Sequence, residues 1–252
     1  MLIVDGDAHI SDLKTGKRID AEEMLARFDA NGIDKSLIWV HPAQTDDEYC
    51  DFPAQNKYIY EMSKKYPDRF LPLGWLNPTQ YGLSATLEQL KRYVEEYGFL
   101  GVKLNGALGK YSITDEAIAI PVIEAIAKSG VVLAFHCGSD PNTHPDKVAQ
   151  IAARYPQTRV LLVHYGREAH AAALAGAKAN KNIHIVGSHM EDFSYISKGV
   201  SEIGSDRISF GSDSPFQSLE GALESYKPEL AKMSEQDAAM VMGGSLLKFF
   251  GV

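Results

Sequence analysis

Short apolar runs recur along the chain, and segments with the hydrophobic spacing of a helix separate them. The runs are continuously apolar and do not alternate with polar residues, which is typical of parallel strands covered on both faces. We therefore expect buried strands at residues 2–6, 36–40, 71–76, 101–105, 131–136, 160–164, 183–187 and 208–213.

Three of the intervening segments predict helices most clearly, at residues 21–32, 83–98 and 115–130. The first and last of these close on glycine, a common residue at helix ends. Asp115 and Asp146 stand where helix N-caps are expected.

Eight strands that alternate with helices in 252 residues predict an α/β protein. Their number and the chain length match a (β/α)8 or TIM barrel. A doubly wound open sheet is the alternative, but it would be expected to carry a glycine-rich phosphate loop after its first strand. The chain has "DGDAHI" at that place. Because no linker-like or repeated segment divides the sequence, we expect a single domain over residues 1–252.

Composition limits the classes of function. The formal net charge of −8, without a Lys/Arg block, gives no basic surface for nucleic acid. No apolar run is long enough to span a membrane, and the first residues do not resemble a signal peptide. The two cysteines, Cys50 and Cys137, form no disulfide framework, so we expect a cytoplasmic protein. Without a nucleic-acid or membrane signal, we expect its partner to be a small-molecule substrate. Assembly into a homo-oligomer stays open.

The stretch "IVDGDAHI" ends the first apolar run with Asp5, Asp7 and His9 at spacings of two. In an extended strand such residues point to the same side. The two carboxylates would then concentrate negative charge where it is poorly solvated, so we expect a positive charge to meet them.

Polar residues also follow the other predicted strands, at the ends where barrel enzymes place their chemistry. Five of the eight histidines fall at these ends. The full set is Asp7, His9, His41, Asn77, Lys103, Asn105, His136, His164, Ser188, His189 and Asp213.

Four of these residues, Asp7, His9, His136 and Asp213, form a mixed nitrogen and oxygen ligand set. Such a set suits zinc or a similar divalent ion, which would offset the carboxylates of the first strand. Zinc is the ion we expect, with manganese or magnesium as alternatives.

The motifs "HCG" (136–138), "HYG" (164–166) and "GSDSPF" (211–216), in this order, resemble the amidohydrolase superfamily. The similarity is to its amidohydrolase-related branch, which contains metal-dependent hydrolases and aminocarboxymuconate-semialdehyde-type decarboxylases. The resemblance implies that His9 and His136 bind metal and that Asp213 both binds metal and moves protons. His164 would polarise the substrate or transfer a proton. The first histidine of the family pair is Asp7 here, which could shift the preference toward harder ions such as manganese or magnesium.

With these roles, we expect hydrolysis of an ester, lactone or amide by a metal-activated water, with Asp213 and His164 as catalytic residues. Lys103, Asn105, His41 and His189 are expected to bind the substrate. A carboxylated Lys103 that bridges two metals is an alternative for that residue.

The same residues permit non-oxidative decarboxylation of a small carboxylic acid, with an aromatic acid as one candidate. We favour hydrolysis because the chain is short and has little sequence for a lid over the barrel mouth. A barrel that binds metal without catalysis is the third alternative.

Overall fold

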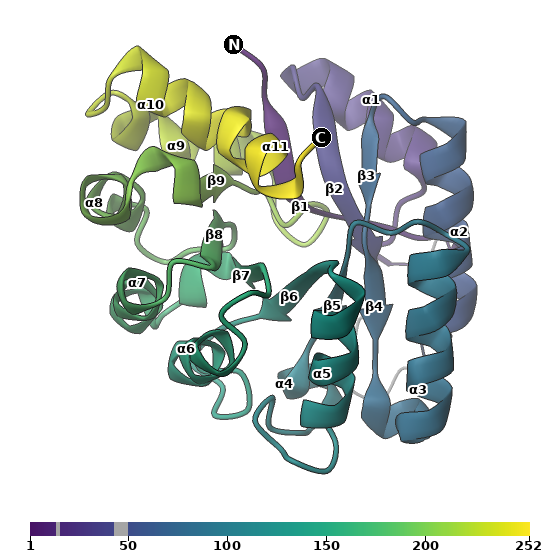
Figure 1. Ribbon diagram of the computed structural model, residues 1–252. Helices are drawn as coiled ribbons and strands as arrows, with labels where there is room; N and C mark the ends of the chain where they lie inside the picture. The colour runs from purple at the N-terminus through teal and green to yellow at the C-terminus, as the bar shows by residue number, and fades with distance from the viewer. Residues whose placement is uncertain (14–15, 43–49) are drawn as a thin grey trace. The chain divides into compact units, whose positions relative to one another are not determined.

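The computed structural model describes residues 1–13, 16–42 and 50–252, in which strands and helices alternate along the chain (Figure 1). The strands are β1 (Val4–Ile10), β2 (Lys35–Val40), β3 (Phe70–Pro72), β4 (Gly74–Leu76), β5 (Gly101–Leu104), β6 (Val132–His136), β7 (Val160–Val163), β8 (Ile183–Gly187) and β9 (Ile208–Phe210). The helices are α1 (Ala21–Asn31), α2 (Phe52–Lys65), α3 (Pro78–Glu95), α4 (Gly106–Gly109), α5 (Ile120–Ser129), α6 (Pro145–Arg154), α7 (His170–Ala179), α8 (Ser194–Ile203), α9 (Leu219–Leu230), α10 (Glu235–Ala239) and α11 (Ser245–Phe250).

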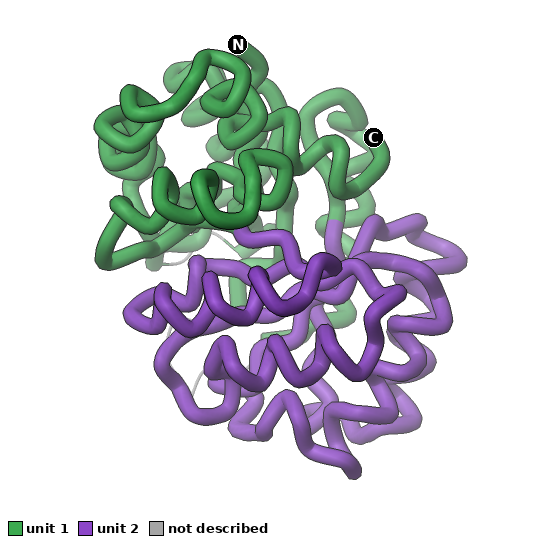
Figure 2. Tube along the Cα trace, turned by 60° about the vertical axis from the view of Figure 1, so that its left-hand side comes forward, with its two compact units in different colours: residues 1–72, 186–252 green, residues 73–185 purple. Residues whose placement is uncertain are grey.

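The chain divides into two compact units, coloured separately in Figure 2. Unit 1 comprises residues 1–72 and 186–252, and unit 2 comprises residues 73–185. In unit 1, β1 pairs with β2 and β2 with β3, all parallel. In unit 2, parallel pairing runs in chain order from β4 to β8, which begins in unit 2 and ends in unit 1.

Every predicted strand region contains a strand, but some bounds differ. Strand β1 runs to Ile10 and not to residue 6, and β9 ends at Phe210 and not at residue 213. Residues 71–76 were expected to form one strand, but this run forms β3 and β4, with Leu73 between them. The first part pairs with β2 and the second with β5, so the hydrogen-bond ladder changes partner inside the run. All seven residues of β1 are buried, as expected of a strand covered on both faces.

The predicted glycine ends of two helices are confirmed. Gly32 follows α1 with φ 70° and Gly130 follows α5 with φ 76°. Both glycines adopt the left-handed conformation that lets the last turn close without a Cβ clash.

The two predicted aspartate caps are wrong. Helix α5 begins at Ile120, and the Asp115 carboxylate instead accepts hydrogen bonds from the backbone of Ala117 and Ile118, each at 2.8 Å. The N-cap of α6 is His144, and Asp146 lies inside the first turn. Each helix has a proline in its first turn, where the missing N–H of proline costs no hydrogen bond. The proline therefore favours a start of α5 after the predicted cap and a start of α6 before it.

Among the described residues, no helix combines the length and the apolar character needed to cross a membrane.

Candidate metal centre

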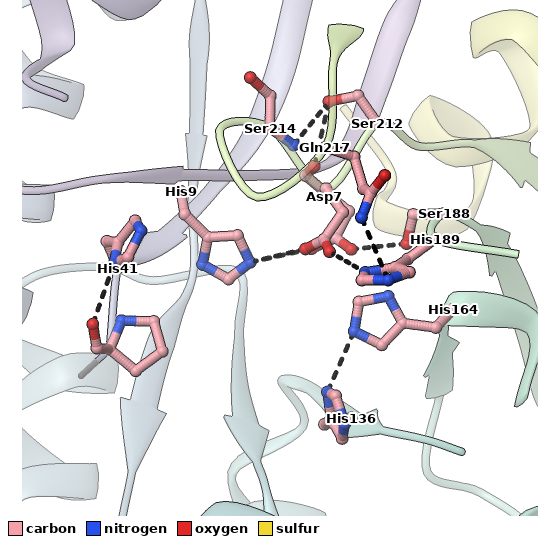
Figure 3. A network of polar contacts seen from close by, with 12 residues as sticks. Asp7, His9, His41, His136, His164, Ser188, His189, Ser212, Ser214 and Gln217 are labelled. Carbon is pink, nitrogen blue, oxygen red and sulfur yellow. Dashed lines mark hydrogen bonds and ion pairs between the residues drawn. The ribbon is translucent and has the colours of Figure 1, made fainter. Parts of the chain in front are cut away.

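Asp7, His9 and Asp213 converge in unit 1. Figure 3 shows the side chains of Asp7 and His9 directed at each other. One ligand atom from each lies within 4.8 Å of the others, and all three residues are buried. His9 Nε2 lies 3.4 Å from Asp7 Oδ1 and 3.4 Å from Asp213 Oδ1. We call these three residues the ligand triad.

Backbone hydrogen bonds between β1 and the segment after β9 place the triad. The Asp213 N–H donates to Asp7 O at 2.8 Å, and the His9 N–H donates to Ser214 O at 2.8 Å. Asp213 itself has φ 57°, a left-handed conformation that is uncommon for a residue with a Cβ. These two main-chain hydrogen bonds thus fix β1 and the segment after β9 relative to each other.

The orientation of His9 leaves its Nε2 directed at the two carboxylates. Its Nδ1 lies 2.8 Å from Val40 O, and because a carbonyl oxygen only accepts, the ring carries its proton on Nδ1. Nε2 is therefore the ring nitrogen that faces the two carboxylate oxygens, and it can bind a cation through its lone pair.

This arrangement fits a divalent cation. Two carboxylate oxygens that lie within 4.8 Å of each other, each 3.4 Å from the same imidazole nitrogen, repel each other unless positive charge lies between them. Ligand atoms about 2.1 Å from one ion are themselves about 3.0–3.4 Å apart. One imidazole nitrogen and two carboxylate oxygens also form a donor set for ions of the zinc and manganese kind.

The second oxygen of each carboxylate is hydrogen-bonded from the segment after β8. Ser188 Oγ donates to Asp7 Oδ2 at 2.6 Å, and His189 Nδ1 lies 2.7 Å from Asp213 Oδ2. The Gln217 side-chain nitrogen in turn lies 3.2 Å from His189 Nε2. Sequence reasoning placed Ser188 and His189 at a strand end but did not foresee these carboxylate contacts.

Asp5 does not join the triad, contrary to the expectation that it shares a face with Asp7 and His9. The strand register shifts between Asp5 and Ala8, so the alternation of side chains is broken there. Ser212 donates to Asp5 from its backbone N–H at 2.9 Å and from its hydroxyl at 2.5 Å. Burial raises the pKa of Asp5 to about 7, although the Ser212 bonds oppose the shift. A carboxyl group that is partly protonated at neutral pH does not require a cation.

His41 lies in unit 1 and stacks on Phe216, with ring centroids 4.2 Å apart. Its Nδ1 lies 2.9 Å from Pro42 O. Burial lowers the pKa of His41 to about 4, so the ring is neutral at neutral pH.

Two further predicted site residues meet in unit 2. His136 closes β6 and His164 follows β7, and His164 Nε2 lies 3.0 Å from His136 Nδ1 (Figure 3). The turn that carries His164 is unusual, because four consecutive residues, 164–167, have positive φ values. Three of them bear side chains, and such clusters of strained backbone occur preferentially at functional sites.

The other predicted residues of unit 2 lie on and after β5. Lys103 is buried, with its Nζ 4.8 Å from the centroid of the Trp75 ring. The Asn105 side chain accepts from the Leu108 N–H at 3.0 Å and so caps the short helix α4.

A structural alternative for Asp213, the N-cap of the following helix, is excluded. Helix α9 begins at Leu219 and its N-cap is Ser218, whose hydroxyl accepts from the Gly221 N–H. The Asp213 carboxylate instead faces His9 and His189.

Comparison with solved structures identifies the fold. A 2,6-dihydroxybenzoate decarboxylase in complex with 2,6-dihydroxybenzoate matches with a TM-score of 0.78 at 18% identity, over 100% of each chain. A dihydroxybenzoic acid decarboxylase from Polaromonas sp. JS666, with bound manganese and the inhibitor 2-nitroresorcinol, matches with a TM-score of 0.75 at 18% identity, over 99% of this chain and 97% of that one. These likenesses confirm the predicted (β/α)8 barrel.

The chain belongs to the amidohydrolase family, whose model matches residues 5–252. The predicted resemblance to the amidohydrolase superfamily is therefore confirmed. No curated protein matches the sequence.

The expectation of hydrolysis is wrong. A probable 2-pyrone-4,6-dicarboxylic acid hydrolase from Acinetobacter baumannii matches with a TM-score of 0.70 at 15% identity over 100% of each chain, below the values for the decarboxylases. The expectation depended on the shortness of the chain. That argument fails because this chain covers 100% of the 2,6-dihydroxybenzoate decarboxylase structure.

Proposed function

We propose that this protein is a metal-dependent, non-oxidative decarboxylase of a small aromatic carboxylic acid. The observation that carries the proposal is the ligand triad, in which Asp7 Oδ1, Asp213 Oδ1 and His9 Nε2 face one another. The likeness in fold to hydroxybenzoate decarboxylases supports the choice of reaction.

Manganese is the ion we propose for the triad. Two carboxylates and one imidazole make a harder and more negative donor set than a histidine-rich one, which favours manganese or magnesium over zinc. The Polaromonas relative contains manganese. Elemental analysis of the purified protein separates manganese from zinc.

A divalent ion bound by the triad supplies positive charge that orients an anionic substrate and stabilises charge that develops on its oxygens. The bond that breaks joins the ring carbon to the carboxylate, and its electron pair stays on the ring. A proton must reach that carbon as carbon dioxide leaves. Asp213 is the residue in unit 1 that we propose to relay this proton from solvent to the ring carbon, because its Oδ1 faces the same point as the other ligand atoms. It would carry the proton only during this transfer and would be ionised while it binds the metal.

His136 as a fourth ligand and His164 as a second proton-transfer group stay predictions from the sequence. So do substrate contacts by Lys103, Asn105, His41 and His189. His41 would contribute as a neutral ring, because its pKa of about 4 lies well below neutral pH.

The substrate class follows from the chemistry that the relatives' ligands share. In both 2,6-dihydroxybenzoate and 2-nitroresorcinol, two ring hydroxyls flank the substituent. We propose a benzoate with at least one hydroxyl beside the carboxylate, because a hydroxyl there donates electron density to the carbon that takes up the proton.

The test is release of carbon dioxide from 2,6-dihydroxybenzoate by protein loaded with manganese, with resorcinol measured as the second product. We expect turnover that chelation abolishes and manganese restores. Asp206→Asn is a matched control, because Asp206 pairs with Lys248 on the surface of unit 1, away from the triad. Failure of the manganese-loaded protein to release carbon dioxide from any hydroxybenzoate would overturn the proposal.

A further inference from the structure

We propose that Ser188 and His189 act together as a carboxylate brace that aims both carboxylates of the ligand triad. The inference rests on the metal site of the proposed function and assigns positioning roles to two consecutive residues.

The two contacts of the brace are equivalent. Ser188 binds Oδ2 of Asp7 at 2.6 Å, and His189 binds Oδ2 of Asp213 at 2.7 Å. In each carboxylate the remaining oxygen, Oδ1, lies 3.4 Å from His9 Nε2. A carboxylate whose Oδ2 is fixed cannot rotate its Oδ1 away without losing a short hydrogen bond in a buried place.

The local backbone makes this double contact possible. Gly187, the last residue of β8, is fixed by the Tyr226 hydroxyl, which donates to Gly187 O at 2.6 Å. His189 has φ 48°, a left-handed conformation that turns the chain sharply after Ser188. Two neighbouring side chains therefore reach carboxylates that come from different segments, β1 and the turn after β9.

Gln217 supports the imidazole side of the brace. Because an ionised Asp213 only accepts, His189 donates from Nδ1, and its Nε2 accepts from the Gln217 side-chain amide at 3.2 Å. His189 and Gln217 also line a cavity of about 310 Å³ within unit 1, together with Ser212 and Ser225. The imidazole thus lies between this cavity and the carboxylate that it orients.

The first experiment measures manganese affinity by calorimetric titration of the wild type, Ser188→Ala and His189→Ala. We expect each variant to bind manganese about 10- to 100-fold more weakly, the usual effect of removing a partner that orients a metal ligand. Ser225→Ala is the matched control, since Ser225 lines the same cavity but bonds to Gly221 O, and it should bind manganese like the wild type.

Chemical rescue distinguishes a brace from general damage. Removing the His189 ring joins its space to the cavity, so added imidazole should restore manganese binding to His189→Ala but not to Ser188→Ala. Wild-type affinity in either variant would overturn the brace, and so would the absence of rescue.

Crystals of the metal-free Ser188→Ala/His189→Ala variant separate this inference from the proposed function. We expect both Oδ1 atoms to turn away from His9 Nε2, and unchanged positions would overturn the brace. If the wild type binds no manganese, the proposed function fails, and the positions of the carboxylates in these crystals still decide the brace.

Discussion

The ligand triad of unit 1 and the His136–His164 pair of unit 2 are both built at strand ends, but by different means. In the triad, the main-chain oxygen of Val40 and the side chains of Ser188 and His189 orient the groups through hydrogen bonds. In the pair, one hydrogen bond of 3.0 Å joins the rings, and a turn of four positive-φ residues presents His164.

The difference in charge shows what each region is suited to do. Two carboxylates that face one imidazole nitrogen attract a cation. Two imidazoles bring no negative charge, and the hydrogen bond between them can transmit a proton. The triad is therefore suited to holding a metal ion, and the pair to moving a proton.

The largest expected effect compares His9→Ala with His136→Ala. His9→Ala removes the only nitrogen of the triad, so bound manganese and all activity should be lost. If His136 is the fourth ligand, His136→Ala should lose the metal in the same way, as measured by elemental analysis after desalting. Full metal content in His136→Ala would confine metal binding to unit 1.

Asp213→Asn tests the double role of that residue as ligand and proton donor. We expect decarboxylation to fall about 100- to 10,000-fold, because an amide neither carries the charge nor releases the proton. The measurement is carbon dioxide release at saturating manganese, with Asp206→Asn as control. Near-wild-type turnover would remove Asp213 from the chemistry.

His164→Ala should separate proton transfer from metal binding. We expect the variant to retain its manganese and to lose about 100-fold in turnover, since general acid–base groups contribute at least that much. Metal content and turnover are measured on the same preparation. A variant with full turnover would leave His164 without its predicted role.

The last comparison concerns Asp5, the carboxyl group next to the triad that does not require a cation, and it affects stability and not turnover. Its pKa rises from 3.8 to about 7 on folding, so the folded state favours the protonated form. Its contribution to stability is therefore full below about pH 4 and is lost as the pH rises through 7, by roughly 4 kcal/mol in all.

Asp5→Asn should abolish this pH dependence, because its side chain does not titrate. Urea unfolding of the metal-free protein at pH 5, 6 and 7 measures it, and the wild type should lose stability with rising pH more steeply than the variant. Parallel curves would show that Asp5 is ionised in the folded protein throughout this range.

Much of the fold could be predicted because parallel strands that are buried on both faces appear in the sequence as continuously apolar runs. The interruption at Leu73 could not, since it depends on which strand each half of the run pairs with. Similarly, the caps of α5 and α6 depend on where a proline allows a helix to start.

In the site, too, some features could be predicted from the sequence and others could not. Asp7, His9 and Asp213 could be found because barrel enzymes place their chemistry at strand ends. The separate role of Asp5 could not, because a register shift inside β1 is invisible in the residue pattern. Ser188 could be placed at a strand end, but its contact with Asp7 could not be foreseen, since Asp7 lies 181 residues away in the chain.

The close packing around Gly187 has a consequence for mutational surveys. A methyl group there would lie 2.4 Å from the Tyr226 hydroxyl and 2.5 Å from Ile196 Cδ1. A scan for essential positions should therefore single out this glycine beside the acidic and histidine residues, although it has no side chain to offer to any chemistry. Gly187 would matter because only a residue without a Cβ fits between Tyr226 and Ile196. Laboratory evolution of new specificities would therefore have to keep this glycine.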